Sequence, residues 1–228
     1  MDAEINEIFE SIQGEGIFVG VRQLFIRFSK CNLKCVYCDT PRKSDLCRNY
    51  VSGTILNNPV SSEYVSSLIK NVKVHSISFT GGEPLLYADF IASLEKTRPF
   101  YLETNMTLPD EAKKIKDIVD YVAGDFKIRE ALPSADYDEV VENTIECFRI
   151  LRHNSRRVTF CKIILPEEFD VEEVINNAES VKDYVICFVL QPVFGSKNID
   201  ILLALQKKLM DFSDTRIVPQ VHKYLGVR

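Results

Sequence analysis

The sequence predicts an α/β fold: a partial, open TIM-like barrel of about six βα units, preceded by an N-terminal hairpin or flap. Short apolar runs rich in β-branched and aromatic residues alternate with segments of helical spacing, as in parallel strands joined by right-handed crossovers. The chain has 228 residues, whereas a complete eight-unit barrel takes about 250. Residues 4–20 precede the first unit and are expected to form the flap. No linker or repeat divides the chain, so residues 1–228 are expected to form one domain.

Six apolar segments are expected to form the strands, because Val, Ile, Phe and Tyr suit a pleated, half-buried surface. They are residues 23–28, 76–79, 100–103, 121–126, 158–164 and 185–190.

Helical patterns lie between these segments. Residues 65–72 carry apolar side chains at i, i+3, i+4 and i+7, and Ser61 or Ser62 offers an N-cap for that helix. Pro109 suits the first position of another helix. Three more patterns cover residues 141–148, 171–178 and 202–209.

The charge balance and hydropathy exclude several classes of protein. Lys plus Arg number 28 and Asp plus Glu number 33, which gives a net charge of −5. This balance argues against a protein that grips nucleic-acid phosphates. No apolar run approaches the roughly 20 residues that span a bilayer, and the acidic N-terminus has no apolar core of a secretory signal behind it. A cytoplasmic protein without a membrane partner is therefore expected.

Seven cysteines are present, and three of them follow the first predicted strand as C-x3-C-x2-C: Cys31, Cys35 and Cys38. An odd number of cysteines without a signal sequence is not typical of a disulfide framework. Three thiolates on one tight loop suit a 4Fe–4S cluster with one iron left open to an outside molecule. The alternative is a zinc site using Cys35 and Cys38, but such sites take four ligands, and no second CxxC or His pair is present.

Polar motifs also follow the other predicted strands. The second strand leads into Gly81, Gly82 and Glu83, where glycines allow close approach of a ligand and the carboxylate can accept from an ammonium group. Alone, such a Gly-Gly turn is common. Polar residues at 103–107 and 124–127 follow the third and fourth strands. Because the carboxyl ends of parallel strands meet at one edge, these motifs are expected to share one site.

The cysteine motif, with an aromatic residue before its last cysteine, resembles that of the radical S-adenosylmethionine (SAM) superfamily. The resemblance implies that the amino and carboxylate groups of SAM chelate the open iron, and that an electron delivered through the cluster splits SAM into methionine and a 5′-deoxyadenosyl radical. It makes Cys31, Cys35 and Cys38 the catalytic cluster ligands. It implies cofactor-binding roles for Tyr37, Cys38, Asp39, Gly82, Glu83, Asp125, Phe126, Lys127, Gln191 and Pro192.

Residues 9–16 (FESIQGEG), Arg27 and the Cys38-Asp39-Thr40 run narrow this resemblance to the 7-carboxy-7-deazaguanine synthase family. The resemblance implies conversion of 6-carboxy-5,6,7,8-tetrahydropterin to 7-carboxy-7-deazaguanine with loss of ammonia and regeneration of SAM, a lyase step toward queuosine- or archaeosine-type nucleosides. It implies Thr40 as a Mg²⁺ ligand, a homodimer, and an electron donor such as flavodoxin or ferredoxin. The implied substrate-binding residues are Ile12, Gln13, Gly14, Glu15, Arg27 and Thr80.

Other interpretations remain open at this point. Without the resemblance, Arg27 fits a surface salt bridge and Thr40 fits a helix N-cap. Met106 stands where the family usually has glycine, and residues 41–59, with Cys47, match nothing in the family. The C-terminus, including His222, is either a contributor to the substrate site or a surface tail.

Two other functions compete with the synthase reading. One is another small radical SAM enzyme, such as an activase that installs a glycyl radical in a partner protein. The other is a non-enzymatic iron–sulfur electron carrier or sensor.

Overall fold

The architecture rests on one curved, open sheet of ten strands in a computed structural model that describes residues 1–38, 40, 45–133 and 136–228. Seven neighbouring strands, from β12 to β3, are parallel, and β2 lies antiparallel to β3. In sheet order the strands are β12 (Thr215–Ile217), β11 (Phe188–Pro192), β10 (Val158–Leu165), β9 (Tyr121–Asp125), β8 (Phe100–Thr104), β7 (Ser76–Gly81), β3 (Arg22–Phe28), β2 (Ile5–Ile12), β4 (Leu46–Asn49) and β5 (Thr54–Asn57). The predicted α/β class with an open sheet is confirmed.

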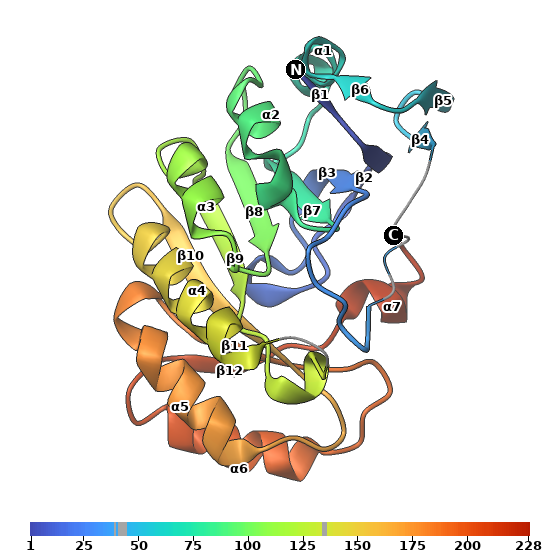
Figure 1. The fold of residues 1–228 in the computed structure, drawn as a ribbon. Helices are drawn as coiled ribbons and strands as arrows, with labels where there is room; N and C mark the ends of the chain where they lie inside the picture. Colours follow the sequence, from blue (N-terminus) through green and yellow to red (C-terminus); the bar gives the residue numbers. More distant parts are fainter. Residues whose placement is uncertain (39, 41–44, 134–135) are drawn as a thin grey trace.

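Helices connect the parallel strands, and one more helix follows the last of them. They are α1 (Ser62–Asn71), α2 (Ala88–Ala92), α3 (Pro109–Ile115), α4 (Tyr137–Ile150), α5 (Val171–Val181), α6 (Ile199–Leu209) and α7 (Val221–Leu225). Figure 1 shows α2 to α6 in series along one side of the sheet, with α7 on the other side near the C-terminus. The Ser61 side chain caps α1 by accepting from the Tyr64 amide, as predicted. None of the described helices is long and apolar enough to cross a membrane.

Several parts of the fold differ from the sequence prediction. Strand β11 begins at Phe188 rather than at residue 185, although Ile186 and Cys187 already hydrogen-bond to β10. Helix α2, with only five residues, and strand β12, with only three, were not predicted. Elements this short carry too few residues for a periodic pattern.

The unmatched segment 41–59 contains a hairpin in its described part. Strands β4 and β5 pair antiparallel, and β4 adds parallel to β2, so the hairpin extends one edge of the sheet. Cys47 of β4 is fully buried in the main core, and burial raises the pKa of its thiol to about 12. This cysteine is therefore a core residue rather than a reactive thiol.

The two faces of the sheet have separate apolar cores. The larger core packs beneath the helices, and a smaller one holds Tyr101, Phe160 and Val189, which alternate along their strands with residues of the larger core. The ring of Phe18, in the short 3₁₀ helix η1 (Gly16–Phe18), packs edge-on against Tyr101. Residues that follow β2 thus cover the inner face and turn the flap toward the carboxyl ends of the strands.

Candidate functional site

One cavity collects side chains from the carboxyl ends of the parallel strands, from the flap and from the C-terminal segment. Most of the residues singled out from the sequence line it. They are Ile12, Gln13, Gly14, Glu15, Arg27, Cys31, Cys35, Tyr37, Cys38, Thr40, Thr80, Gly82, Glu83, Asp125 and Lys127. The expectation that these motifs share one edge of the sheet matches the structure.

Four of the expected cofactor-binding residues are not among the cavity-lining residues. Phe126 is fully buried in the main core and stacks near Phe148. Gln191 is fully buried in β11, and Pro192 ends that strand. Asp39 lies outside the described residues. Their binding roles stay predictions.

The cysteine loop presents three free thiols to the cavity. Cys31 and Cys35 are half-buried, and Cys38 is exposed. Asn105 Nδ2 donates to Cys31 Sγ at 3.9 Å, and the Leu33 amide donates to the same sulfur at 3.4 Å. Burial raises the pKa of the Cys31 thiol. Two polar donors at this sulfur suit a thiolate that serves as an iron ligand.

The donor set fits a 4Fe–4S cluster better than a single ion. Among the described residues, no three His, Cys, Asp or Glu side chains converge closely enough to hold one metal ion. A cluster needs no such convergence, because each thiolate ligates a different iron. A closed zinc site needs four ligands around one centre.

Gly82 places the cysteine loop against the end of β7. A Cβ at this position would lie 1.9 Å from the carbonyl oxygen of Lys30, the residue before the first cysteine. The Gly82 amide donates to Phe28 O at 2.9 Å, and the Glu83 amide donates to Lys30 O at 2.7 Å. The sequence predicted close approach to a ligand here. The structure shows that the close neighbour of Gly82 is protein backbone.

Glu83 is buried at the bottom of this junction. Its carboxylate accepts from the Leu85 amide at 2.9 Å, from Thr104 Oγ1 at 2.6 Å and from the Asn105 amide at 2.8 Å. Burial raises the pKa of the carboxyl to about 7, against these hydrogen bonds that lower it. Glu83 thereby ties β7 to the loop after β8.

Met106 occupies that loop in a conformation that glycine adopts more easily. Its φ is 57°, and its side chain is fully buried. A left-handed backbone costs a residue with a Cβ about 1–2 kcal/mol. Met106 therefore combines a left-handed backbone conformation with a side chain packed in the core.

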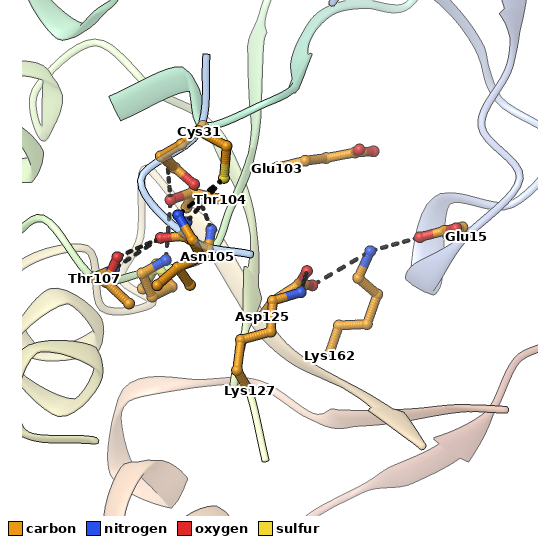
Figure 2. Close-up of polar contacts among 12 residues, drawn as sticks. Glu15, Cys31, Glu103, Thr104, Asn105, Thr107, Asp125, Lys127 and Lys162 are labelled. Carbon is orange, nitrogen blue, oxygen red and sulfur yellow. Dashed lines mark hydrogen bonds and ion pairs between the residues drawn. The ribbon is translucent and has the colours of Figure 1, made fainter. Parts of the chain in front are cut away.

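A chain of buried charges crosses the cavity. Lys162 Nζ lies 2.5 Å from Glu15 Oε2 and 3.3 Å from Asp125 Oδ1, and Lys127 Nζ lies 2.7 Å from Asp125 Oδ2 (Figure 2). Burial alone would raise the pKa of Glu15, but Lys162 and hydrogen bonds such as that from Gln220 lower it to about 2. Burial lowers the pKa of Lys162, but Asp125 and Glu15 raise it more, so the net pKa lies well above the usual value.

Tyr37 extends this chain toward the cysteine loop. The Lys127 ammonium lies 5.4 Å from the centre of its ring, a cation–π contact. Tyr37 and Lys127 both line the cavity. The charge chain therefore runs from the flap, at Glu15, to the residue beside Cys38.

A second polar group lies on the flap side of the cavity. Gln13 Nε2 donates to Glu103 Oε1 at 2.6 Å, and Thr80 Oγ1 donates to Glu103 Oε2 at 2.6 Å. Gln13 also donates to Gln23, at 3.0 Å. Both of these hydrogen bonds to the Glu103 carboxylate come from neutral donors, and the residue lines the cavity wall.

The C-terminal segment lies against the flap and forms part of the cavity wall. The Val221 amide donates to Gly14 O at 2.9 Å, and a Cβ on Gly14 would lie 2.2 Å from His222 Nδ1. Gln220, His222, Lys223 and Arg228 line the cavity. Of the two readings of the C-terminus, the structure favours the one in which it joins the site.

Sequence reasoning missed Lys162, and it named Glu103 only as part of a polar strand end. Lys162 lies in an otherwise apolar strand, where a charged residue is seldom buried without a partner. That solitary charge was a usable signal. Its two partners come from the flap and from β9, and the sequence alone did not connect them.

Comparison with known proteins was consistent with this geometry. Residues 25–179 match the model of the Radical SAM superfamily. A 7-carboxy-7-deazaguanine synthase of Archaeoglobus fulgidus is 60% identical over 228 residues, which cover all of both chains. A 7-carboxy-7-deazaguanine synthase of Methanothermobacter thermautotrophicus is 36% identical over an alignment that covers all of this chain and 99% of the relative.

Solved structures share the fold at lower identity. The crystal structure of QueE from Escherichia coli matches with a TM-score of 0.59 and 20% identity, covering 97% of this chain and 95% of the other. Streptococcus suis SuiB bound to S-adenosylmethionine matches with a TM-score of 0.57 and 13% identity, covering 84% and 48%. These likenesses confirm the open α/β architecture.

Proposed function

Because the chain belongs to the radical SAM superfamily and to its 7-carboxy-7-deazaguanine synthase family, we propose that it converts 6-carboxy-5,6,7,8-tetrahydropterin to 7-carboxy-7-deazaguanine with loss of ammonia. The full-length 60% identity to a synthase of that name carries this conclusion. It favours the synthase over a glycyl-radical activase or an electron carrier. The joining of the three cysteines and the flap residues in one cavity supports it.

Cys31, Cys35 and Cys38 are proposed to hold the cluster. When bound, the cluster and SAM supply the radical that removes a hydrogen atom from the pterin. The proposed cofactor contacts are five residues that line the cavity: Tyr37, Gly82, Glu83, Asp125 and Lys127. Phe126, Gln191 and Pro192 do not line the cavity and are proposed to support these residues from behind. Lys127, paired with Asp125 at 2.7 Å, keeps a fixed charge next to the Tyr37 ring.

The substrate side is proposed to lie between the flap and β8. Arg27 carries a fork of donors that suits the pterin carboxylate. The Glu103 carboxylate, held by Gln13 and Thr80, can accept from amino and ring N–H donors. The backbone of Ile12, Gln13 and Gly14 and the side chain of Glu15 complete this wall.

Finer points of the proposal concern the metal, the partners and the location. Thr40 lines the cavity, and its hydroxyl suits a Mg²⁺ ion that keeps substrate oxygens and water in its shell. Exposed Val36 and Cys38 leave the cysteine loop open to an electron donor such as flavodoxin or ferredoxin. A homodimer in a reducing cytoplasm is the expected setting.

The test is product formation without oxygen. The reconstituted protein is given reductant, SAM, Mg²⁺ and 6-carboxy-5,6,7,8-tetrahydropterin, and 7-carboxy-7-deazaguanine is measured by mass spectrometry. Arg27→Ala is expected to lower kcat/KM by about 10- to 100-fold, since charge-assisted hydrogen bonds contribute about 1.5–3 kcal/mol. Arg22→Ala is the matched control, because Arg22 lies on the same strand and pairs with Glu10 outside the cavity. Release of 5′-deoxyadenosine without product would keep the superfamily and reject this substrate.

A further inference from the structure

The carboxylate of Glu7 joins two arginines at the mouth of the cavity. Glu7 Oε1 lies 2.8 Å from Arg27 Nε, and Glu7 Oε2 lies 2.9 Å from Arg228 Nη1. The Glu7 side chain is 19% exposed and the Arg27 side chain 24%, so their pair is largely screened from water. Arg27 and Arg228 both line the cavity, whereas Glu7 lies behind them on β2.

Arg27 is held from two directions. Glu7 Oε1 forms an ion pair at Arg27 Nε without a hydrogen bond from the Nε–H, and the Arg27 guanidinium lies 5.5 Å from the centre of the Phe9 ring, which stacks on Phe25 at 5.0 Å. With the Glu7 carboxylate beside Nε, a bound carboxylate would bind the two terminal nitrogen atoms of the fork. A guanidinium fixed at Nε and on one face loses less rotamer freedom when it takes up a ligand.

Arg228 fastens the C-terminal segment to the same residue. Its guanidinium lies 3.8 Å from the centre of the Tyr50 ring, besides the contact with Glu7. Nearer the start of the segment, Gln220 Nε2 donates to Glu15 Oε1 at 2.8 Å. The segment is thus attached to the flap at one end and to β2 at the other.

We propose that Glu7 is a positioning residue that couples two events: it orients the fork of Arg27 for the substrate carboxylate, and it latches Arg228 so that the C-terminal segment closes the cavity. The part that concerns Arg27 rests on the proposed function. The latch does not, because it is a contact within the chain. Replacing the Glu7 carboxylate with a neutral amide is therefore expected both to release the C-terminal segment and to weaken pterin binding.

The latch is tested with carboxypeptidase B, which removes a C-terminal arginine. Loss of Arg228 from the folded 228-residue protein is followed by intact mass spectrometry in wild type, Glu7→Gln and Glu10→Gln. Glu10 is the matched control, because it lies on the same strand and pairs with Arg22 across the same two strands. We expect release about fivefold faster in Glu7→Gln and unchanged in Glu10→Gln, since an ion pair of intermediate exposure contributes about 1 kcal/mol. Equal rates in Glu7→Gln and wild type would overturn the latch.

A measurement on wild type alone covers the case in which Glu7→Gln does not fold. Raising NaCl from low to high concentration is expected to speed release of Arg228 relative to a free peptide ending in Val-Arg, because salt screens a partly exposed pair. No difference from the peptide would refute the latch.

Steady-state kinetics test the orientation of Arg27. Glu7→Gln is expected to raise the KM for 6-carboxy-5,6,7,8-tetrahydropterin about tenfold while kcat falls less than about threefold, the pattern of lost substrate binding. Glu10→Gln is expected to match wild type. An unchanged pterin KM in Glu7→Gln would reject the orienting role. If wild type itself makes no product, the proposed function fails, while the carboxypeptidase result still decides the latch.

Discussion

Replacing Lys162 with methionine keeps a long, unbranched side chain and removes the cation that separates Glu15 from Asp125. Lys162 is 6% exposed, and its ammonium lies 2.5 Å from Glu15 Oε2. The pKa of Glu15 is lowered from 4.5 to about 2, chiefly by Lys162 against the opposing effect of burial. That lowering is the net result of Lys162, of hydrogen bonds from other residues and of the opposing burial, so it gives the direction of the Lys162 effect rather than its size. Removing one partner of a buried ion pair costs about 3–5 kcal/mol. Lys162→Met should therefore lower the free energy of unfolding by about 3 kcal/mol at pH 7, within the range for breaking a buried ion pair.

Urea denaturation followed by circular dichroism measures this loss. Lys113→Met is the matched control: Lys113 pairs with Asp110 on the surface of α3, so its loss should cost less than about 0.5 kcal/mol. The double variant Glu15→Gln/Lys162→Met should regain part of the stability, because it no longer buries the unpaired Glu15 carboxylate. The difference between wild type and Lys162→Met should shrink as pH falls, beginning above pH 4.5, because without Lys162 burial raises the pKa of Glu15 above its usual value and the carboxylate takes up a proton there. A Lys162→Met protein as stable as wild type at pH 7 would refute the assignment of this pair as a stabilising contact.

Three further outcomes follow from the same geometry. Gly82→Ala puts a Cβ 1.9 Å from a backbone oxygen, so the cysteine loop must move by about 1.5 Å. Iron content after reconstitution should fall, and activity should drop about 100-fold. The control is Gly20→Ala, which has no atom within 4 Å and a φ of +87°; it should lose only about 1 kcal/mol of stability and keep its iron. In wild type the contribution of Glu15 to the free energy of unfolding is complete above pH 4.5 and is lost as pH falls toward 2. In Glu15→Gln the urea midpoint of unfolding should therefore depend less on pH in that window, and an unchanged pH dependence would contradict the lowered pKa. Iodoacetamide at pH 8 should label exposed Cys38 of the cluster-free protein well before Cys47, whose thiol pKa is raised to about 12, and peptide mass spectrometry showing the reverse order would place Cys47 at the surface.

The parallel part of the fold could be predicted well from the sequence. Strand residues such as Phe25 and Val189 lie in continuous apolar runs, because both faces of a parallel sheet are buried. The long helices follow from their periodicity, as in α6, where Leu202, Leu205 and Leu209 are all buried. The site motifs could be found because each directly follows a strand, and the direction of the strands brings their ends together.

Contacts between distant segments were beyond the sequence. The hydrogen bond from Val221 to Gly14 joins residues at opposite ends of the chain, and no periodic pattern relates them. The partners of Lys162 come from two other segments, so its burial is a property of the assembled sheet. Helix α2 has too few residues to present an apolar stripe. In each case the missing information was three-dimensional proximity rather than residue type.

The junction between Gly82 and Lys30 has a consequence for how the metal centre is built. The hydrogen bonds that hold the start of the cysteine loop, from the Gly82 and Glu83 amides to Phe28 and Lys30, use main-chain atoms alone. The conformational entropy of placing the loop is therefore spent when the sheet folds, not when iron arrives. Insertion of iron and sulfide becomes a late maturation step on a finished scaffold, and a chain stripped of its iron by air should be repairable without unfolding.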